Sequence, residues 1–586
     1  MKLEKIANDV TVSKVAQGPL AQGTAATNKA QAPAPQLLSA EKSASQAKAI
    51  GITTARLDAV AEGAKAAIDK SLSYLDRMGA APKSFLPTSV DADSLGMTHV
   101  RFERFHEGVR VFGEQVVTHL GVGLTGDVAS MTGSVEPLPL GLGGSPAIST
   151  KDAVASARKT FEGRPKESAV ERCIFFGADG VVHSGYHVQL VDLSVPNPRR
   201  MSYLVDGEKG AIIQSWNQIG GVINPEAAKR MLANARNITP AGAGKAGTSQ
   251  RPQGAADDKT MYSGMVEIFA KQNGNTYVLD DGSRGKGLAT KDAKNQSRAG
   301  SAVEVTDNNN VWGETGDNAR QVSAVDAHYG AQMTYDTYKN ILGIDSIDLK
   351  GYRLVSNVHI GRNYVNAFWD GSQMNYGDGD GKTAGPLTTL DIAGHEITHG
   401  LTTNTANLIY SGESGGLNEA MSDIGGFLVE WYASQHNPGV KWEWTMGEDC
   451  WTPTNGNPND GLRYMNNPTK DGYSVDHYSK YPQQTEVHGS SGIANCAFYQ
   501  LAEENLDGKK DVNSISKRRI DNGIGVDKAA KIFFRALMHY MTSRTNFAGA
   551  RKACIQAATD LFGADSVEVK KTKEAWSVVG VEDKAV

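Results

Sequence analysis

The stretch Asp391-Ile-Ala-Gly-His395-Glu396-Ile-Thr-His399-Gly400 decides how this chain of 586 residues is interpreted. On a helix, His395 and His399 are four positions apart, so both imidazole rings project from one face. Two neutral imidazole nitrogens on one face can bind the same tetrahedral zinc ion at about 2.0–2.1 Å. Glu396 lies beside His395, where its carboxylate can accept a proton from a water molecule on the metal. The alternative is a surface helix whose histidines have ordinary hydrogen-bond partners, and the surrounding sequence must decide between the two.

A third metal ligand is available downstream. The stretch Asn418-Glu419-Ala-Met-Ser-Asp423 begins 19 residues after His399, inside a second helical pattern at 417–433. A third ligand from a separate helix leaves one coordination position open for water, as in catalytic zinc sites. Asp423, one turn beyond Glu419, suits a position where it accepts the N–H of a ligand histidine and fixes the tautomer. On spacing alone, Glu419 fits a solvated helix carboxylate equally well.

The first 235 residues are predicted to form a tail followed by two small mixed units. Residues 1–50 are rich in Ala, Gln, Ser, Thr and Pro, and we expect them to be disordered because they have too few large apolar residues to form a core. Residues 98–120 alternate apolar and polar side chains around Glu107-Gly108, which predicts a β-hairpin. Further expected elements are helices at 54–78 and 151–162 and strands at 182–194 and 200–215.

A change of composition near residue 240 separates this region from the rest of the chain. Residues 236–258 are small and polar with Gly and Pro, which predicts an exposed linker of the kind that proteases cut. Residues 259–385 are rich in Gly, Asn and Tyr with short strand-like runs, whereas long amphipathic helices such as 526–541 dominate after residue 387. This order predicts an α+β protein with a β-rich lobe and a helical lobe that meet near residue 390.

Composition narrows the possible partners. The formal net charge is −5, and no dense Lys/Arg patch is interleaved with aromatic residues, so we expect no nucleic-acid partner. No apolar run approaches about 18–20 residues, so we expect no membrane span. The four cysteines are too few for a disulfide scaffold, and pairing among Cys450, Cys496 and Cys554 is left open. Residues 1–20 lack the apolar stretch of a classical signal peptide.

From about Tyr262 to Gly580 the chain resembles the thermolysin-like metalloendopeptidases. The matching stretches, in that family's order, are VDAHYGAQMTYDTYKN (325–340), NAFWDGSQMNYGDGDG (366–381), GHEITHG (394–400), LIYSGESGGLNEAMSD (408–423), DHYSKY (476–481), VHGSSGIANCAFY (487–499) and GVDKAAKIFFRAL (525–537). The resemblance implies a two-lobe peptidase with its active-site cleft between the lobes and zinc-dependent cleavage of internal peptide bonds. One catalytic zinc would be bound by His395, His399 and Glu419, with Glu396 as the catalytic base.

The resemblance also assigns side chains around the reacting peptide bond. Tyr410 and His488 correspond to residues that stabilise the oxyanion. Glu486 stands where a related branch of the family has an aspartate that orients this histidine. The remaining correspondences are Asn418 beside the zinc ligands, and Asn366, Ala367 and Arg463 at the bound peptide. The strand containing Asn366 and Ala367 would bind an extended peptide as an additional strand.

Two further sets of residues follow from the resemblance. The pocket on the leaving-group side would be lined by Leu387, Ile392, Met446 and Leu462, and an apolar lining predicts cleavage before bulky apolar residues. One or more structural calcium ions would be bound by Asp391, Glu430, Glu443 and Glu448, since oxygen-only ligands suit calcium. Thr445 stands where the family has an acidic residue, which leaves the number of calcium ions open.

Residues 54–250 resemble the long prosegment of the same family, and THVRFERFHEGVRVFGEQV (98–116) is similar to its fungalysin/thermolysin propeptide motif. The resemblance implies an α+β propeptide that assists folding and inhibits the enzyme until it is cut. An excess of basic residues before position 250 and of acidic residues after it fits such a pair, and fits ordinary variation between domains equally well. The expected divisions are a disordered segment (1–50), a propeptide domain (51–135), a second propeptide domain (136–235), a linker with the maturation cleavage (236–258), a β-rich lobe with the catalytic helix (259–400) and a helical lobe (401–586).

The expected product is therefore a secreted monomeric peptidase that acts on proteins and peptides. Two alternatives remain open at this point. One is a metal-stabilised adhesion or chaperone module without activity, although such a protein has no need of the base Glu396. The other is an aminopeptidase that uses the same zinc site and removes residues from chain ends.

Overall fold

The structure is a computed structural model that describes residues 62–123, 126–224, 258–314, 319–451, 461–505 and 512–582. The chain divides into two compact units, which are described separately. The first comprises Met1–Asp192, Arg199–Gln218 and Thr542–Arg544, and the second comprises Leu193–Pro198, Ile219–Met541 and Thr545–Val586. The tail expected at 1–50 lies outside the described residues, as does the linker expected at 236–258 except for residue 258.

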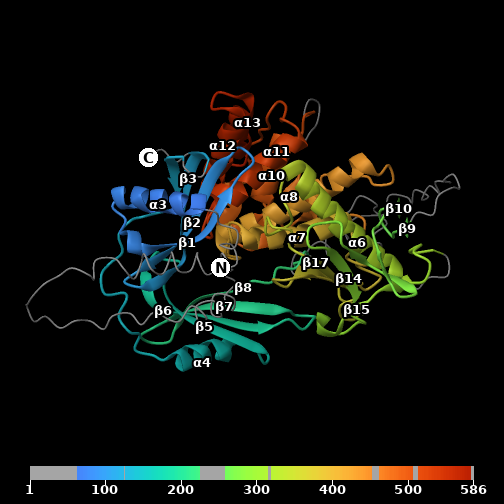
Figure 1. The fold of residues 1–586 in the computed structure, drawn as a ribbon, viewed down its shortest axis with the longest axis horizontal. Helices are drawn as coiled ribbons and strands as arrows, with labels where there is room; N and C mark the ends of the chain where they lie inside the picture. Colours follow the sequence, from blue (N-terminus) through green and yellow to red (C-terminus); the bar gives the residue numbers. More distant parts are fainter. Residues whose placement is uncertain are drawn as a thin grey trace, which may run out of the picture. The chain divides into compact units, whose positions relative to one another are not determined.

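The first unit is built on an eight-stranded sheet (Figure 1). Its strands are β1 (Phe85–Ala92), β2 (Met97–His106), β3 (Val109–Val122), β4 (Val128–Thr132), β5 (Glu167–Phe176), β6 (Val182–Asp192), β7 (Arg199–Asp206) and β8 (Ile212–Asn217). Their order is β1-β2-β3-β5-β6-β7-β8, with β4 also paired to β3, and only β3 and β5 pair in parallel. Helix α3 (Glu62–Arg77) packs on β1 and β2, and helix α4 (Thr150–Thr160) packs on β5, β6 and β7.

Local sequence signals explain the first unit well. The expected hairpin forms from β2 and β3, and Glu107 and Gly108 at its turn have φ values of 49° and 79°. Two consecutive positive φ angles are typical of the tight turns that match the twist of paired strands. Ser149 caps α4 through a capping box with Asp152, and the strands expected at 182–194 and 200–215 are β6, β7 and β8. Strands β1, β4 and β5 were not predicted.

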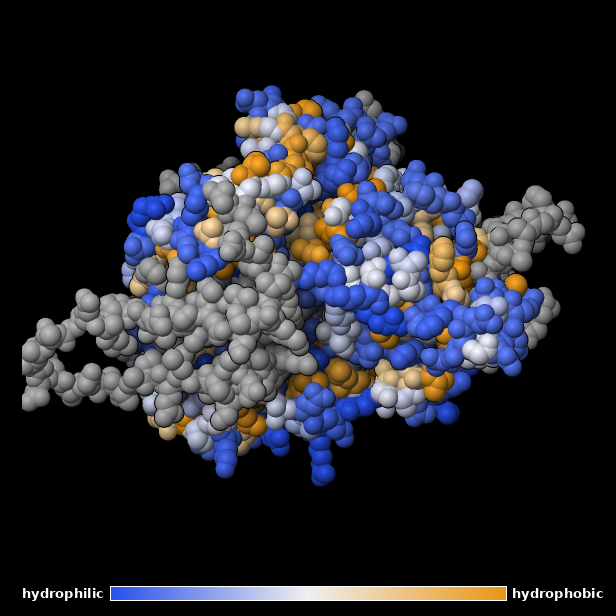
Figure 2. All heavy atoms as spheres, viewed as in Figure 1, coloured by the Kyte–Doolittle hydropathy of each residue, from blue (hydrophilic) through white to orange (hydrophobic). Residues whose placement is uncertain are grey.

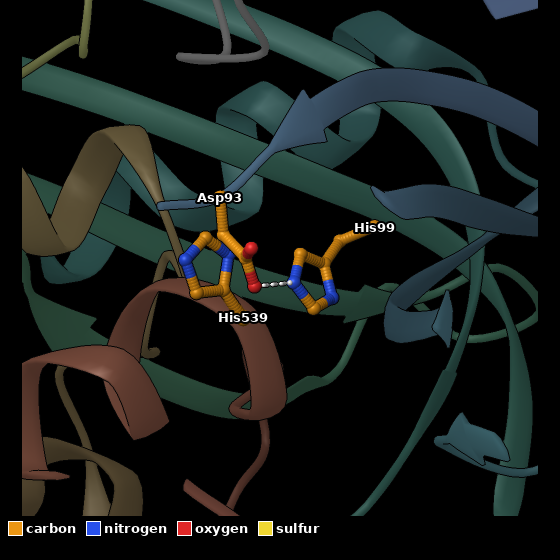
Figure 3. A group of neighbouring side chains, drawn as sticks. All are labelled: Asp93, His99 and His539. Atoms are coloured by element: carbon orange, nitrogen blue, oxygen red, sulfur yellow. Dashed lines mark hydrogen bonds and ion pairs between the residues drawn. The ribbon is translucent and has the colours of Figure 1, made fainter. Parts of the chain in front are cut away.

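A chain of buried hydrogen bonds crosses the first strands of this sheet. His99 Nε2 lies 2.9 Å from Asp93 Oδ2, as Figure 3 shows, and His99 Nδ1 lies 2.9 Å from His119 Nδ1 across the β2–β3 pair. His119 Nε2 in turn lies 2.9 Å from Thr132 Oγ1 on β4. Because unpartnered polar groups are costly inside a sheet, these partners allow three polar side chains to be buried beside the propeptide-motif stretch.

The second unit begins with a mixed sheet in the order β13-β14-β17-β19-β18, with β15 paired to β14. These strands are β13 (Asp280–Asp281), β14 (Leu288–Asp292), β15 (Val303–Glu304), β17 (Leu354–Val358), β18 (Ala367–Trp369) and β19 (Met374–Tyr376). Short strand pairs are formed by β9 (Asp258–Lys259) with β10 (Met265–Val266), by β12 (Thr276–Val278) with β11 (Lys271–Asn273) and β16 (Thr306–Asp307), and by β20 (Thr445–Met446) with β21 (Arg463–Tyr464).

Helix α6 (Ala319–Thr337) was not predicted from the sequence, which indicated only short strands in this region. The helix packs on β14 and β17 and also on α7, so most of its residues are buried on every side. A helix buried all round has no polar face, and its sequence therefore lacks the amphipathic period that marks a surface helix.

The remaining helices form the second half of this unit (Figure 1). They are α7 (Leu390–Asn404), α8 (Gly412–His436), α9 (Val487–Ser490), α10 (Gly492–Ala502), α11 (Val526–Arg535), α12 (Phe547–Phe562) and α13 (Val567–Val578). Helix α8 covers the expected 417–433 and begins five residues earlier, and α11 continues into a π-helical turn at Ala536–Tyr540. A single hydrophobic core joins the sheet to these helices, and the β-rich-then-helical order is confirmed.

Three further features concern the cysteines, the hydropathy of the helices and the surface. Each of the four cysteines is buried as a thiol. Among the described helices, none has the length and apolarity needed to cross a bilayer. On the face drawn in Figure 2, hydrophobic side chains are interspersed with hydrophilic ones, which is the usual appearance of a protein surface exposed to water.

Candidate active site

Helix α7 carries both histidines of the decisive stretch into the interior of the second unit. His395 and Glu396 are fully buried and His399 is 6% exposed. The histidine rings lie in an edge-to-face arrangement with their centroids 4.8 Å apart, as the four-residue spacing predicts. The alternative of a surface helix whose histidines have ordinary hydrogen-bond partners is therefore wrong, because α7 is buried at both positions.

Glycines bring helix α8 close enough to α7 to supply the third ligand (Figure 1). A Cβ on Gly394 would lie 2.9 Å from the Gly426 Cα, and a Cβ on Gly425 would overlap Thr398 Oγ1. Two helix backbones can approach this closely only where no side chain intervenes. The crossing places Glu419, fully buried on α8, against His395 and His399.

Replacing Gly425 with alanine is expected to disturb this crossing. The added methyl group would overlap Thr398, so the helices must separate, which costs about 1–3 kcal/mol despite alanine's better helix propensity. The free energy of unfolding from urea titration and the affinity for zinc should both be lower in the variant than in the parent protein. The matched control is Gly282→Ala, whose new Cβ meets no atom within 4 Å. Equal behaviour of the two variants would contradict this role of the crossing.

Three donor atoms converge between the helices. His395 Nε2 lies 3.1 Å from His399 Nε2 and 3.6 Å from Glu419 Oε2, and His399 Nε2 lies 3.4 Å from Glu419 Oε1. Ligands bound tetrahedrally at about 2.0–2.1 Å lie about 3.3–3.4 Å from one another. The spacing of the three residues therefore matches what a zinc ion requires.

The polar partners of the two rings, a hydrogen-bonded amide oxygen for His399 and an ion-paired carboxylate for His395, fix which nitrogens face this point. His399 Nδ1 lies 2.8 Å from Asn418 Oδ1, and His395 Nδ1 lies 3.0 Å from Asp423 Oδ1. Both partners are acceptors, so both protons belong on Nδ1 and both Nε2 atoms present lone pairs to each other. Two lone pairs and a carboxylate at one buried point repel unless a cation joins them, so the residues fit a metal ion.

Asp423 is the centre of a buried ionic network around these ligands. Arg463 donates to it through Nε at 2.8 Å and through Nη2 at 2.5 Å, and Asn495 Nδ2 donates at 2.8 Å. Burial acts to raise the pKa of Asp423, but Arg463 and His395 outweigh it and hold this pKa well below its usual range. Asp423 therefore stays ionised and keeps the His395 ring oriented. Asn495 was not predicted, because nothing in its local sequence marks it.

Glu396 is held next to the three donors. Its Oε2 accepts a 2.7 Å hydrogen bond from the Trp369 backbone N–H on β18, whereas its Oε1 is buried without a protein hydrogen-bond partner. Burial, with a contribution from Glu419, raises the pKa of Glu396 to about 7. A carboxylate with one fixed and one unoccupied oxygen is suited to exchange a proton with a water molecule. The contact with Trp369 was not predicted.

His488 and Tyr410 line the same point. His488 Nδ1 lies 2.7 Å from Glu486 Oε1, and its Nε2 lies 2.8 Å from the Gly221 carbonyl oxygen. Both partners are acceptors. Burial acts to lower the pKa of His488, but the charges of Glu419 and Glu486 outweigh burial and raise this pKa to about 9. The glutamate at 486 thus reaches the histidine despite its extra methylene. The Tyr410 hydroxyl donates to Glu419 Oε1 and lies 3.4 Å from His488 Nε2.

The residues expected to bind a peptide contact a segment of this chain, Ile219–Asn224. Ala367 O accepts from the Val222 N–H at 3.1 Å, Asn366 Oδ1 accepts from the Ile223 N–H at 2.9 Å, and Arg463 Nη1 donates to Val222 O at 2.6 Å. The four residues expected to line the pocket are all buried: Leu387, Ile392, Met446 and Leu462. Sequence reasoning gave no indication that residues 219–224 would lie here.

Acidic side chains crowd together beside the start of α7. Burial, followed by the charges of Glu448, Asp391 and Asp449, raises the pKa of Glu430 well above its usual value. The Oε2 atoms of Glu430 and Glu448 are buried without a hydrogen-bond partner. Asp449 was not predicted, although it directly follows Glu448, and burial with the charges of Asp391 and Glu443 raises its pKa to about 6. Among the described residues, these carboxylates do not form a group with three ligand atoms within 4.8 Å of one another, as His395, His399 and Glu419 do.

Comparison with known proteins agrees with this geometry. Three family models match the chain: "Thermolysin metallopeptidase, catalytic domain" at residues 255–403, "Thermolysin metallopeptidase, alpha-helical domain" at 406–581, and "Fungalysin/Thermolysin Propeptide Motif" at 83–135.

Curated relatives match over most of their length. The thermostable neutral protease NprT of Geobacillus stearothermophilus is 38% identical over 510 residues, 83% of this chain and 84% of that protein. Thermolysin of Alicyclobacillus acidocaldarius subsp. acidocaldarius is 36% identical over 507 residues, 83% and 84% of the two chains. Bacillolysin of Bacillus cereus is 37% identical over 517 residues, 86% of each chain. The chain therefore belongs to the thermolysin family of metalloendopeptidases, and it carries the propeptide motif of that family.

Proposed function

We propose that this chain is the precursor of a secreted, zinc-dependent neutral endopeptidase that cleaves before bulky apolar residues and is released by self-cleavage. The observation that carries the proposal is the convergence of His395, His399 and Glu419 beside the unoccupied oxygen of Glu396. We further propose the division into a tail, two propeptide domains, a linker and two peptidase lobes given above, with a monomeric mature enzyme.

Zinc is the metal that the donor set favours. Two imidazole nitrogens and one carboxylate form one of the ligand sets of catalytic zinc. When bound by His395, His399 and Glu419, zinc supplies Lewis-acid chemistry, lowering the pKa of a water molecule and polarising a carbonyl group.

The chain's own groups provide the proton transfers and the charge stabilisation. Glu396 Oε1 accepts the proton of the attacking water, while Oε2 stays fixed by the Trp369 N–H. His488 donates from Nε2 toward the carbonyl oxygen, where negative charge develops as the water attacks, and Glu486 holds the ring in this orientation. Tyr410 adds a second donor, a hydroxyl group that in this structure donates to Glu419 and lies 3.4 Å from His488 Nε2. Glu396 then delivers its proton to the leaving nitrogen.

Substrate orientation follows from the contacts to main-chain atoms. Asn366 and Ala367 offer acceptors to two successive peptide N–H groups, and Arg463 offers a donor to the carbonyl group between them. These contacts are hydrogen bonds to main-chain atoms, so they do not depend on the side chains of the peptide. They can position any extended peptide, as when a peptide is added to a sheet as a further strand. Sequence preference would come from the apolar pocket of Leu387, Ile392, Met446 and Leu462, which favours bulky apolar side chains after the cleaved bond.

The same contacts favour internal cleavage over removal of terminal residues. They are made to the segment Ile219–Asn224, which continues on both sides of the Gly221 carbonyl group facing His488, as the interior of a chain does and a chain end does not. Incubating the activated protein with casein, with and without a chelator, tests for activity, and end-group analysis of the fragments tests for internal cuts. Activity that survives removal of zinc, or release of single amino acids alone, would refute the proposal.

We also propose that calcium stabilises the peptidase through Asp391, Glu430, Glu443 and Glu448, with Asp449 as an additional acidic neighbour. Removing calcium with a chelator that spares zinc should lower the thermal midpoint, because buried carboxylates then repel or must take up protons. Glu430→Gln should make the midpoint less dependent on calcium. Glu574→Gln, an exposed position on α13, is the control. A midpoint independent of calcium in the parent protein would argue against this site.

A further inference from the structure

We propose that the Gly221–Val222 peptide bond is a substrate built into this chain and is the first bond that the enzyme cuts in its own precursor. The inference rests on the proposed peptidase function and adds the identity of its first substrate. It concerns the segment Ile219–Asn224, which belongs to the same compact unit as the catalytic helices.

The segment lies along the edge strand β18 at Gly221 and bends at Val222 and Ile223. Gly221 forms an antiparallel bridge with Phe368 on β18, and the Val222 N–H donates to Ala367 O at 3.1 Å. The side chain of Asn366 binds both main-chain groups of Ile223. It accepts from the Ile223 N–H at 2.9 Å and donates to Ile223 O at 3.1 Å. One bridge and one main-chain hydrogen bond, completed by the Asn366 side chain, thus bind the main chain of the segment much as an edge strand binds an added peptide.

Two carbonyl groups define which bond faces the catalytic residues. The Gly221 oxygen accepts from His488 Nε2 at 2.8 Å, and that nitrogen lies 3.5 Å from Glu419 Oε2. The next carbonyl oxygen, on Val222, is bound by Arg463 Nη1 at 2.6 Å. The Gly221 carbonyl is therefore the one presented to the proposed metal site, and the bond that follows it joins Gly221 to Val222.

The side chains on either side of this bond suit their surroundings. Val222 is fully buried in the same hydrophobic cluster as Leu387, Ile392 and Leu462, three of the residues expected to form the pocket. A Cβ on Gly220 would overlap the Tyr410 hydroxyl, and a Cβ on Gly221 would overlap the side chain of Asn366. The sequence Gly220-Gly221-Val222 thus allows the backbone to approach the catalytic groups and places an apolar residue in the apolar pocket.

The reaction is a hydrolysis with water as the only co-reactant. The C–N bond between Gly221 and Val222 breaks, and a C–O bond forms from water to the Gly221 carbon. Glu396 takes one proton from the water and passes it to the Val222 nitrogen, and the second proton of the water moves from the new Gly221 carboxyl group to the Val222 amine, leaving a carboxylate and an ammonium group. Until then, the segment occupies Asn366, Ala367 and Arg463, so an external peptide cannot bind to them. Cleavage in the 236–258 linker would then be a later trimming step.

The main test follows the order of cuts in the full precursor. The protein is purified in chelator, zinc and calcium are added, and new amino termini are determined over time by sequencing and intact mass. The first new terminus should be Val222, and its half-time should stay constant over a tenfold dilution because the substrate is in the same chain. A first terminus elsewhere, or a half-time that lengthens with dilution, would overturn the proposal.

Variants at Val222 sharpen this test. Val222→Leu should keep the cut, whereas Val222→Asp should slow it at least about 100-fold because a charge must enter an apolar pocket. Val181→Asp, which adds the same charge at a half-exposed position on the other unit, should be cut at the parent rate. Equal rates for the two aspartate variants would count against the pocket assignment.

A second measurement needs no turnover. In the metal-free precursor, hydrogen exchange should show the amides of Val222 and Ile223 protected, and Asn366→Ala should remove the protection at Ile223 while leaving that of α12 unchanged. Exchange at the rate of an unstructured peptide would contradict the bound segment. If added casein is cut while the first terminus lies elsewhere, this inference alone fails. If neither casein nor the precursor is cut, the proposed peptidase function fails.

Discussion

Replacing Glu396 with glutamine is expected to lower the kcat for peptide hydrolysis by at least about 10³ while the zinc content stays near one ion per chain. Glutamine has the same shape, and its amide oxygen can still accept the hydrogen bond from the Trp369 N–H. It cannot accept the proton of the attacking water, so only the chemical step should suffer. The three zinc-binding atoms belong to other residues and are unchanged.

The measurement combines a fluorogenic peptide assay with elemental analysis of the same samples. The precursor variant should also remain uncut, because self-cleavage needs the same base. Glu574→Gln, an exposed glutamate-to-glutamine change on α13, should match the parent protein in both assays. An E396Q protein that retained most of its activity with full zinc would remove Glu396 from the mechanism.

Asp423→Ala is expected to have the largest effect on stability of any single change near the site. It removes the acceptor of the Arg463 guanidinium, the Asn495 amide and the His395 Nδ1–H together. Arg463 is 5% exposed, and leaving a buried charge without its partner costs about 3–5 kcal/mol. Zinc affinity should fall about 10–100-fold because the His395 ring is no longer held in orientation.

A double variant separates the two effects. D423A/R463M removes both charges, so the free energy of unfolding should recover most of the loss while zinc affinity stays low. Urea titration and competition with a zinc indicator measure the two quantities. Asp565→Ala, at an exposed position between α12 and α13, is the control. A single D423A variant as stable as this control would show that the network contributes nothing.

The helix period alone was enough to place the two histidines. A spacing of four residues determines that His395 and His399 share a face, whatever surrounds them. Glu419 was different, because its spacing fitted a solvated carboxylate equally well. What decides its position is the close crossing of α7 and α8, which depends on Gly394, Gly425 and Gly426. The sequence shows these glycines, but not which backbone each of them meets.

Other features left no readable signal in the sequence. Helix α6 is buried on all sides and lacks a polar face. Trp369 contributes to the site through its backbone N–H, which every residue except proline possesses. The segment at 219–224 meets its partners 143 to 267 positions further along the chain, again mostly through backbone atoms. Contacts of this kind are set by tertiary structure, so local pattern and composition do not reveal them.

The close crossing of α7 and α8 at these glycines also makes the thermal stability of the protein depend on the zinc concentration. With no side chain between the helices, the ligands from one helix and the ligand from the other move together, and opening the crossing releases the ion. Binding to the folded state alone adds RT ln(1 + [L]/Kd), about 2.7 kcal/mol when free zinc stands at a hundred times its Kd. The free energy of unfolding of the zinc-bound protein should therefore rise with the zinc concentration of the medium.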